Sequence, residues 1–346
     1  MGNPLRINPM RLLTPALLAL SALPARADDW PQWGGPRRDL VWRETGIVRT
    51  LPTPGLLPRL WATPIGEGYA GPAVADGRVF VCDLVDRQGQ KGTERVLALD
   101  AGTGKVLWTH AYPVEYRIDY PAGPRATPVV DGPCVYTVGA MGDFFCLEAA
   151  TGKVVWKMNL PADQKTLIPK WGMAASPLID GGMLILLVGA KDALVVSFDK
   201  LTGQVLWSAI DDPEVGYGPP VLVEIGGVRQ VIEFHPRAVT SIDPANGKVL
   251  WEVPFKSKSG LTVPTPRQVG NRVFVTAFYN GPLMIEVGAD GRAAVGDARR
   301  DGQRPLVERL PDPERGPLFH PQRAGGADHR RAVAGRLQGD QPREAD

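Results

Sequence analysis

A phrase of eleven residues recurs four times in the chain and constrains its fold more than any other feature. It reads ALDAGTGKVLW at 98–108, CLEAATGKVVW at 146–156, SFDKLTGQVLW at 197–207 and SIDPANGKVLW at 241–251. The closing tryptophans Trp108, Trp156, Trp207 and Trp251 are 48, 51 and 44 residues apart. Self-similarity at a period of about 20–50 residues is typical of solenoids, propellers and other repeat arrays.

The middle of the phrase predicts a tight turn between two strands. An apolar run ends in an acid, which is Asp100, Glu148, Asp199 or Asp243. A Thr or Asn follows, and then a glycine, which is Gly104, Gly152, Gly203 or Gly247. Glycine takes positive φ without a steric penalty, and the acid can bond free backbone groups of the turn. We therefore expect these acids and glycines to be structural, in a hairpin that ends at the tryptophan.

A second hairpin is predicted before the phrase in the stretches 71–82, 126–139 and 175–189. Each contains two apolar runs separated by Asp-Gly or Gly-Gly, a strong hairpin signal. Residues 183–188 are apolar on both alternating faces, as in a sheet that is buried on both sides. The sequence thus predicts an all-β fold, an incomplete β-propeller of about four to five four-stranded antiparallel blades. The repeated tryptophans are expected to be structural and largely buried between neighbouring blades.

The repeat resembles the PQQ-type β-propeller repeat of quinoprotein dehydrogenases and BamB-type outer-membrane assembly proteins. The stretches DWPQWGGPRRD at 29–39 and YPVEYRIDYPAGPRATPVVDG at 112–132 are also similar to secreted members of that superfamily. The resemblance extends from about residue 29 to residue 288. It implies the propeller fold but is not specific for an activity.

The start of the chain predicts export. Arg6 and Arg11 flank the start of an apolar run, Leu12–Leu23, and Ala25-Arg26-Ala27 fits the small-residue cleavage rule. We therefore expect residues 1–27 to be a secretory signal peptide, 28–60 an N-terminal segment and 61–293 the propeller repeats. The apolar run is too short to span a bilayer, so no membrane span is expected.

Lipid anchoring and nucleic-acid binding are not expected. The BamB resemblance implies a lipoprotein with a cysteine at the cleavage point, but the first cysteine is Cys82. We therefore expect no lipid anchor and a periplasmic or secreted location. The net charge is only +2 and the two signs are interspersed, so the chain lacks the basic patch that a nucleic-acid partner requires.

Signals for catalysis are sparse. His110 and His235 lie in the repeats without another His or Cys at metal-ligand spacing, so a solvated or capping role is expected. The quinoprotein resemblance implies an adjacent Cys-Cys pair, a calcium site and a catalytic Asp, but no two of the three cysteines are adjacent. We expect no catalytic, cofactor-binding or metal-binding residues, and no PQQ or calcium.

The pairing of Cys134 with Cys146 is open at this stage. Both cysteines lie in one predicted hairpin. A turn centred near Met141 would place Cys134 opposite Glu148, which favours buried free thiols over a disulfide.

Two long connections between repeats, 112–125 and 211–220, form a candidate binding rim. Loops on a rigid scaffold often carry function, and aromatic and arginine side chains are favoured at protein interfaces. The candidate residues are Tyr112, Glu115, Tyr116, Arg117, Tyr120, Arg125 and Tyr217. The predicted function is a binding or scaffolding module for a protein or polymer at the cell envelope. A PQQ-dependent oxidoreductase and a carbohydrate- or polymer-binding propeller remain as alternatives.

The composition changes near residue 294. Residues 289–346 contain eleven arginines and no Lys, Trp, Tyr or Ile, and the repeated phrase disappears. Such a composition cannot bury enough apolar surface to fold. We therefore expect residues 294–346 to be a disordered tail or the product of an out-of-frame reading, with the latter favoured.

Overall fold

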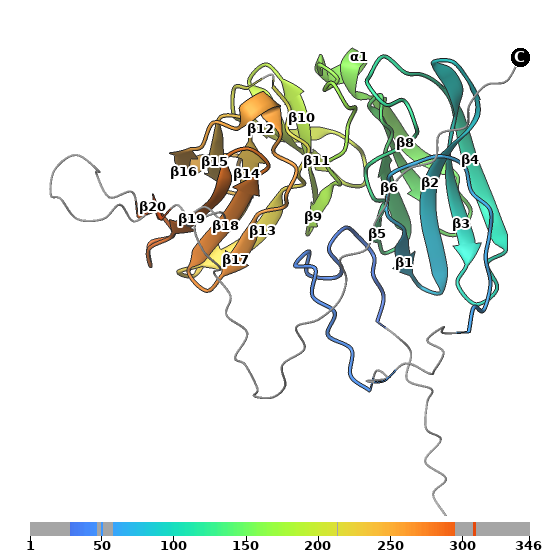
Figure 1. Cartoon of the computed structure of the whole chain (residues 1–346), viewed down its shortest axis with the longest axis horizontal. Coiled ribbons are helices and arrows are strands. Elements are labelled where there is room, and N and C mark those ends of the chain that lie inside the picture. The colour runs from blue at the N-terminus through green and yellow to red at the C-terminus, as the bar shows by residue number, and fades with distance from the viewer. Residues whose placement is uncertain (1–27, 47–49, 51–57, 213, 295–306, 309–346) are drawn as a thin grey trace, which may run out of the picture. The chain divides into compact units, whose positions relative to one another are not determined.

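The computed structural model describes residues 28–46, 50, 58–212, 214–294 and 307–308. The predicted signal peptide and most of the predicted tail lie outside these residues. Within them, the strands form five four-stranded antiparallel sheets, each of which follows the chain order (Figure 1). The expected all-β propeller of four to five blades is therefore confirmed, with five blades.

Each of the first three blades is a meander of four strands. Blade 1 contains β1 (Ala73–Ala75), β2 (Arg78–Gln88), β3 (Lys91–Asp100) and β4 (Val106–Glu115). Blade 2 contains β5 (Val129–Asp131), β6 (Cys134–Val138), β7 (Asp143–Glu148) and β8 (Val154–Asn159), followed by helix α1 (Leu160–Gln164). Blade 3 contains β9 (Leu178–Asp180), β10 (Met183–Ala190), β11 (Ala193–Asp199) and β12 (Val205–Ala209).

The last two blades repeat this order. Blade 4 contains β13 (Val221–Ile225), β14 (Val228–His235), β15 (Ala238–Ile242) and β16 (Val249–Pro254), followed by the 3₁₀ turn η1 (Lys258–Gly260). Blade 5 contains β17 (Arg267–Val269), β18 (Arg272–Ala277), β19 (Gly281–Glu286) and β20 (Val307–Glu308). The fifth sheet thus extends two residues into the segment that was predicted to be a tail.

The hydrophobic core is divided among the interfaces between successive blades. In β10, Leu184 and Leu186 pack in a cluster with blade 2, whereas Ile185 and Leu187 pack in a cluster with blade 4. Alternate residues of a strand point to opposite faces, so a blade with neighbours on both sides needs apolar residues at every position. This explains the unbroken apolar run at 183–188.

The repeated tryptophans connect each blade to the next one. The indole Nε1 of Trp108 donates to the carbonyl of Ala149 at 3.0 Å, and that of Trp156 donates to Lys200 at 3.0 Å. The same bond joins Trp207 to Pro244 at 2.9 Å. Each acceptor directly follows the acid of the next blade's turn, so one side chain fixes one blade to the following one.

Trp61 occupies the same position one period before the first complete phrase. Its Nε1 donates to Ala101 in the turn of blade 1 at 2.9 Å, and its ring lies against Gly104. No strand is assigned around Trp61. The N-terminal part of the chain therefore supplies blade 1 with the tryptophan contact that the other blades receive from a preceding blade.

The N-terminal segment lies along the first strands of several blades. Trp30 forms an antiparallel bridge with Val74 of β1, and the carbonyl of Pro31 accepts from Val130 of β5 at 2.8 Å. Trp33 donates through Nε1 to Thr265, just before β17, at 2.9 Å. The segment from residue 28 onward thus contacts blades that are distant in sequence.

Candidate functional site

The segments that link one blade to the next gather at one end of the blades, which we call the connection face. They comprise residues 116–128, 160–177, 210–220 and 255–266. In each meander these links share an end with the turn between the second and third strands, such as 277–281 in blade 5. The acid-containing turns of the repeated phrase lie at the other end of the blades. The sequence at the connection face therefore differs from blade to blade, whereas the sequence at the opposite end recurs.

The structure corrects the candidate rim at Tyr116. Tyr112 lies in β4 and donates through its hydroxyl to Glu94 Oε2 at 2.7 Å, and the fully buried Tyr116 donates to Oε1 at 2.6 Å. Burial raises the pKa of Glu94, although both hydroxyls act in the opposite direction. Tyr112 and Tyr116 therefore stabilise a buried carboxylate inside the fold, and Tyr116 is not available to a partner.

The other candidates from the first connection lie at the surface. Glu115 ends β4 and lies 3.9 Å from Arg117, with both side chains exposed. Tyr120 is 71% exposed and has a left-handed φ of 55°. The guanidinium of Arg125 lies 5.2 Å from the ring centroid of Tyr69 and donates to the carbonyl of Tyr120. Glu115, Arg117 and Tyr120 are therefore accessible to a partner.

Tyr217, from the second candidate connection, lines a cleft of about 550 Å³ on the connection face. Its ring centroid lies 5.4 Å from that of Trp171, and Lys170 lies 5.7 Å from the Trp171 ring. Tyr279 and Leu167, both more than half exposed, also line the cleft. Links from successive blades thus build a concave aromatic surface with a lysine beside it.

The sequence analysis missed Trp171 and Tyr279, the partners of Tyr217 in this cleft. One signal was present: between Trp108 and Trp251, Trp171 is the single tryptophan that lies outside the repeated phrase. A tryptophan outside the structural position of the repeat has no assigned packing role, which makes it a candidate for binding. Tyr279 carries no comparable signal.

Asp212 holds the neighbouring link in place. Its Oδ2 accepts from Arg237 Nε at 2.7 Å and lies 3.2 Å from His235 Nδ1, while Oδ1 accepts from the backbone of Glu214 at 3.0 Å. His235 also lies 2.9 Å from Thr240 Oγ1 through Nε2. Of the solvated or capping role expected for His235, solvation is wrong, because its side chain is fully buried and burial lowers its pKa.

Asp212, His235 and Thr240 are connected in the order of an acid, a base and a nucleophile, but a substrate cannot reach Thr240. Thr240 is fully buried within β15 and donates to Glu252 at 3.1 Å. A hydroxyl that no substrate can reach cannot act as a nucleophile. The hydrogen bonds among Asp212, His235 and Thr240 therefore hold the link from blade 3 against blade 4. His110 is half-buried beside Phe145, at a ring-centroid distance of 4.8 Å.

The turn acids bond the turns in which they lie. Asp100 Oδ1 accepts from the backbone and the hydroxyl of Thr103 at 2.8 and 2.7 Å, and Asp199 Oδ1 makes the same pair of bonds with Thr202. These bonds lower the pKa of both acids. Asp243 accepts from Asn246 Nδ2 at 2.8 Å.

Metal-binding groups are absent from the part of the chain that the structure describes: no three His, Cys, Asp or Glu side chains gather there. Cys82, Cys134 and Cys146 are free and buried, and Cys134 pairs with Glu148 across the hairpin, as the sequence predicted. Among the described residues, no helix has the length and apolar character needed to cross a membrane.

Comparisons with known proteins agree with the propeller fold. Residues 92–306 match the family described as outer membrane protein assembly factor BamB. The chain is 27% identical over 194 residues to quinohemoprotein alcohol dehydrogenase ADH-IIG of Pseudomonas putida, which covers 51% of this chain and 26% of that protein.

Two solved structures are similar in fold. Quinohemoprotein alcohol dehydrogenase from Comamonas testosteroni matches with a TM-score of 0.53 at 15% identity, over 76% of this chain and 48% of that chain. BamB from Moraxella catarrhalis matches with a TM-score of 0.43 at 17% identity, over 66% of this chain and 70% of that chain. The chain spans about a quarter of the curated dehydrogenase and about half of the Comamonas enzyme. Because the family match covers more than half of the sequence, this chain belongs to the BamB family of PQQ-type β-propeller repeat proteins.

Proposed function

We propose that this chain is an exported propeller that binds a protein partner at the cell envelope through its connection face. The observation that carries the proposal is the cleft formed by Trp171, Tyr217 and Tyr279. Exposed aromatic surface beside polar groups is typical of protein-binding sites. Family membership supports this role, since the matched family is named for an assembly factor.

The lining of the cleft supports an extended peptide segment as the bound element. Aromatic rings on the walls offer apolar contact, while Lys170 and Glu214 at the lining offer charged contacts of both signs. Lys170 also lies 3.3 Å from Asp119 of the preceding link. The cleft is therefore continuous with the surface that carries Tyr120 and Arg125, which enlarges the area that a partner can cover.

Photo-crosslinking tests the proposal. A photoreactive phenylalanine at Leu167, which lines the cleft, is compared with one at Leu201, in the turn at the opposite end of blade 3. The two leucines are 64% and 61% exposed, so the positions are matched in access. We expect a discrete protein adduct in envelope material from position 167 and a much weaker one from position 201.

The double variant Trp171→Ala/Tyr217→Ala provides the specificity control. It should abolish the adduct from position 167 while the protein retains its parent melting temperature within a few degrees. Equal adducts from both positions, or an adduct that survives the double variant, would contradict the proposal. An adduct with polysaccharide in place of protein would support the polymer-binding alternative.

The oxidoreductase alternative rests on the likeness to quinohemoprotein dehydrogenases. The resemblance implies an adjacent Cys-Cys pair, which the chain does not offer, because its three cysteines lie on β2, β6 and β7. We therefore rank this alternative below protein binding.

A further inference from the structure

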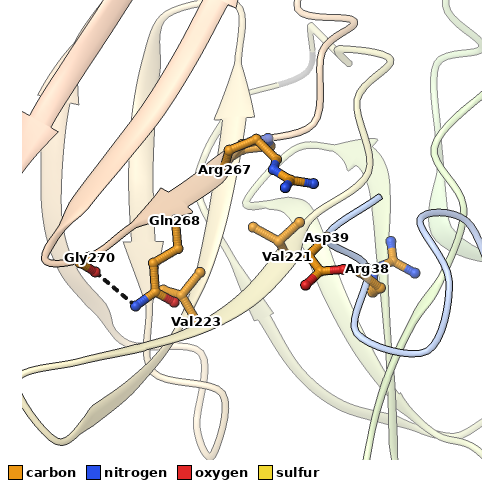
Figure 2. Close-up of a pocket in the computed structure, with 8 residues that line it drawn as sticks. Arg38, Asp39, Val221, Val223, Arg267, Gln268 and Gly270 are labelled. Atoms are coloured by element: carbon orange, nitrogen blue, oxygen red, sulfur yellow. Dashed lines mark hydrogen bonds between the residues drawn. The ribbon is translucent and has the colours of Figure 1, made fainter. Parts of the chain in front are cut away.

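A small pocket of about 230 Å³ lies between the N-terminal segment and blades 4 and 5 (Figure 2). Arg38 and Asp39 contribute one wall, Val221 and Val223 of β13 a second, and Arg267 of β17 a third. We propose that this pocket binds a small oxyanion, either a carboxylate or a phosphate group. The proposal is independent of the protein-binding role, because the pocket shares no residue with the cleft.

Arg38 is a buried cation with only neutral partners among the described residues. It is 5% exposed, and its Nη1 donates to the carbonyl of Pro177 at 2.6 Å. Its Nη2 donates to the carbonyls of Ser176 and Pro220 at 3.2 and 3.1 Å, and its Nε has no partner in the described part of the chain. Burial lowers the pKa of this guanidinium to about 9. A buried charge is costly unless an opposite charge accompanies it.

Arg267 supplies a second positive charge. Its guanidinium makes no hydrogen bond to the described residues, and its Nη1 is buried without a partner there. In Figure 2 this side chain extends across the pocket toward Val221 and Asp39. No described carboxylate lies within 4.0 Å of either Arg38 or Arg267. Arg267 thus brings an unpaired guanidinium nitrogen to the pocket, and Arg38 adds a buried positive charge whose Nη groups are bound to Gln32 and to carbonyls and whose Nε is unpaired among the described residues.

The one carboxylate in the pocket, Asp39, is already neutralised. Arg43 Nη1 donates to Asp39 Oδ1 at 3.0 Å, and its Nη2 forms a second bond to Oδ2. The bonds from Arg43 lower the pKa of Asp39 to about 2, with smaller contributions from the backbone of Val41 and from the positive charge of Arg267. Because Asp39 and Arg43 cancel, the charge of the pocket is set by Arg38 and Arg267.

The remaining lining restricts the ligand class. Gln268 is occupied, since its Nε2 donates to the carbonyls of Glu224 and Gly270 at 2.9 and 3.0 Å. The valine walls offer no hydrogen bonds. The pocket therefore presents positive charge and guanidinium donors on an apolar surround, which suits the planar fork of arginine to a carboxylate or phosphate. Its volume limits the ligand to a small group.

Isothermal titration of the full chain tests the proposal with two probes, inorganic phosphate and succinate, at constant ionic strength set with sodium chloride. We expect saturable binding of at least one probe. The variant Arg267→Gln should weaken that binding about tenfold or more, since it removes a positive charge and a charge-assisted hydrogen bond. Arg272→Gln is the matched control, because Arg272 is an exposed cation of the same blade outside the pocket lining.

The probes separate the two sources of the oxyanion: saturation by phosphate alone assigns a phosphate ligand, and saturation by succinate alone assigns a carboxylate. Arg272→Gln should change the affinity less than twofold. Heat that fails to saturate with either probe, or equal weakening by the two variants, would overturn the proposal. Because Arg267 is not fully buried, the variant should fold, and its circular dichroism spectrum checks this.

Discussion

Individual tryptophan and glycine residues connect neighbouring blades. A Cβ atom at Gly247 would lie 2.7 Å from the Trp207 ring, and one at Gly152 would lie 2.5 Å from the Trp108 ring. Both glycines also have φ near 75°. Glycine is needed here for two separate reasons, backbone conformation and close approach of the indole.

We predict that truncating Trp207 destabilises the protein strongly. Trp207→Ala should lower the free energy of unfolding by about 3–5 kcal/mol, because a packed ring is lost. Trp207→Phe keeps a ring but loses the hydrogen bond to Pro244, which contributes roughly 1 kcal/mol. The smaller ring also leaves a cavity. The total loss in free energy of unfolding should still be smaller than that of Trp207→Ala. Denaturant unfolding measures both. Similar losses for the two variants would contradict this division.

Three glycine-to-alanine variants separate the two requirements for glycine. Gly182 has neither positive φ nor a nearby atom, Gly227 has a φ of 74° with open space, and Gly247 has both constraints. We expect Gly182→Ala to be neutral and Gly227→Ala to cost about 1–2 kcal/mol. Gly247→Ala should cost more, because its Cβ overlaps Trp207. Thermal melts should rank the variants in this order, and any other order would contradict the proposed role of the indole.

Glu233 should make stability depend on pH. It is fully buried in β14, neither carboxylate oxygen has a partner among the described residues, and burial raises its pKa from 4.5 to about 8. Between these values the folded state holds a proton that the unfolded state has lost. The free energy of unfolding therefore falls as pH rises from about 4.5 to about 8, by up to about 1.4 kcal/mol per pH unit.

Glu233→Gln should remove this contribution, which melting temperatures measured across pH 4.5–8 will show. Glu224→Gln, at an exposed position of β13, should keep the parent profile. Identical pH profiles for Glu233→Gln and the parent would mean that Glu233 is not protonated in the folded protein.

At the scale of the strand, a β-bulge before each tryptophan was not predictable from the phrase. In blade 1, Ala98 pairs with Trp108 but Leu99 pairs with Val106, so Leu107 is an extra residue. The same register shift occurs in blades 2, 3 and 4. Because a bulge places two residues opposite one, both Val106 and Leu107 are about half exposed. Alternation from Trp108 would place one of these two on the buried face.

Strand length and long-range contacts limited the prediction of the site. The hairpins, turn acids and turn glycines follow from local signals and could be predicted. The burial of Tyr116 depends on Glu94 and on the extension of β4 to Glu115, neither of which has a local signal. The cleft brings Trp171 together with Tyr217 and Tyr279 from different blades, and a single sequence does not reveal such contacts.

The link that carries Tyr217 should depend on Asp212. Asp212→Ala removes bonds to His235, Arg237 and the Glu214 backbone, and should lower the free energy of unfolding by about 1–3 kcal/mol. Hydrogen exchange should rise in residues 210–220. Asp211→Ala removes only an exposed bond to the Asp192 backbone and serves as the control. Equal exchange in the two variants would contradict this role.

At the scale of the whole molecule, stability comes from contacts between successive blades. The main apolar clusters join blades 1 and 2, 2 and 3, 3 and 4, and 4 and 5. In such an array each unit depends on its neighbours. Signal cleavage after Ala27 concerns residues outside the described ones, and so does the out-of-frame tail predicted at 294–346, except for Ala294 and β20. They stay predictions, which N-terminal sequencing and resequencing of the gene will test.

We propose that this propeller binds partners and does not carry out PQQ chemistry. Titration of the full chain with PQQ in the presence of calcium tests this claim most directly, with heat and the PQQ absorption spectrum as readouts. We predict no saturable heat of binding. We also predict no shift of the PQQ spectrum larger than the shift caused by an unrelated protein of similar size that lacks the propeller fold. Saturable binding of PQQ with a micromolar or tighter constant, dependent on calcium, would contradict the claim and place the oxidoreductase function first.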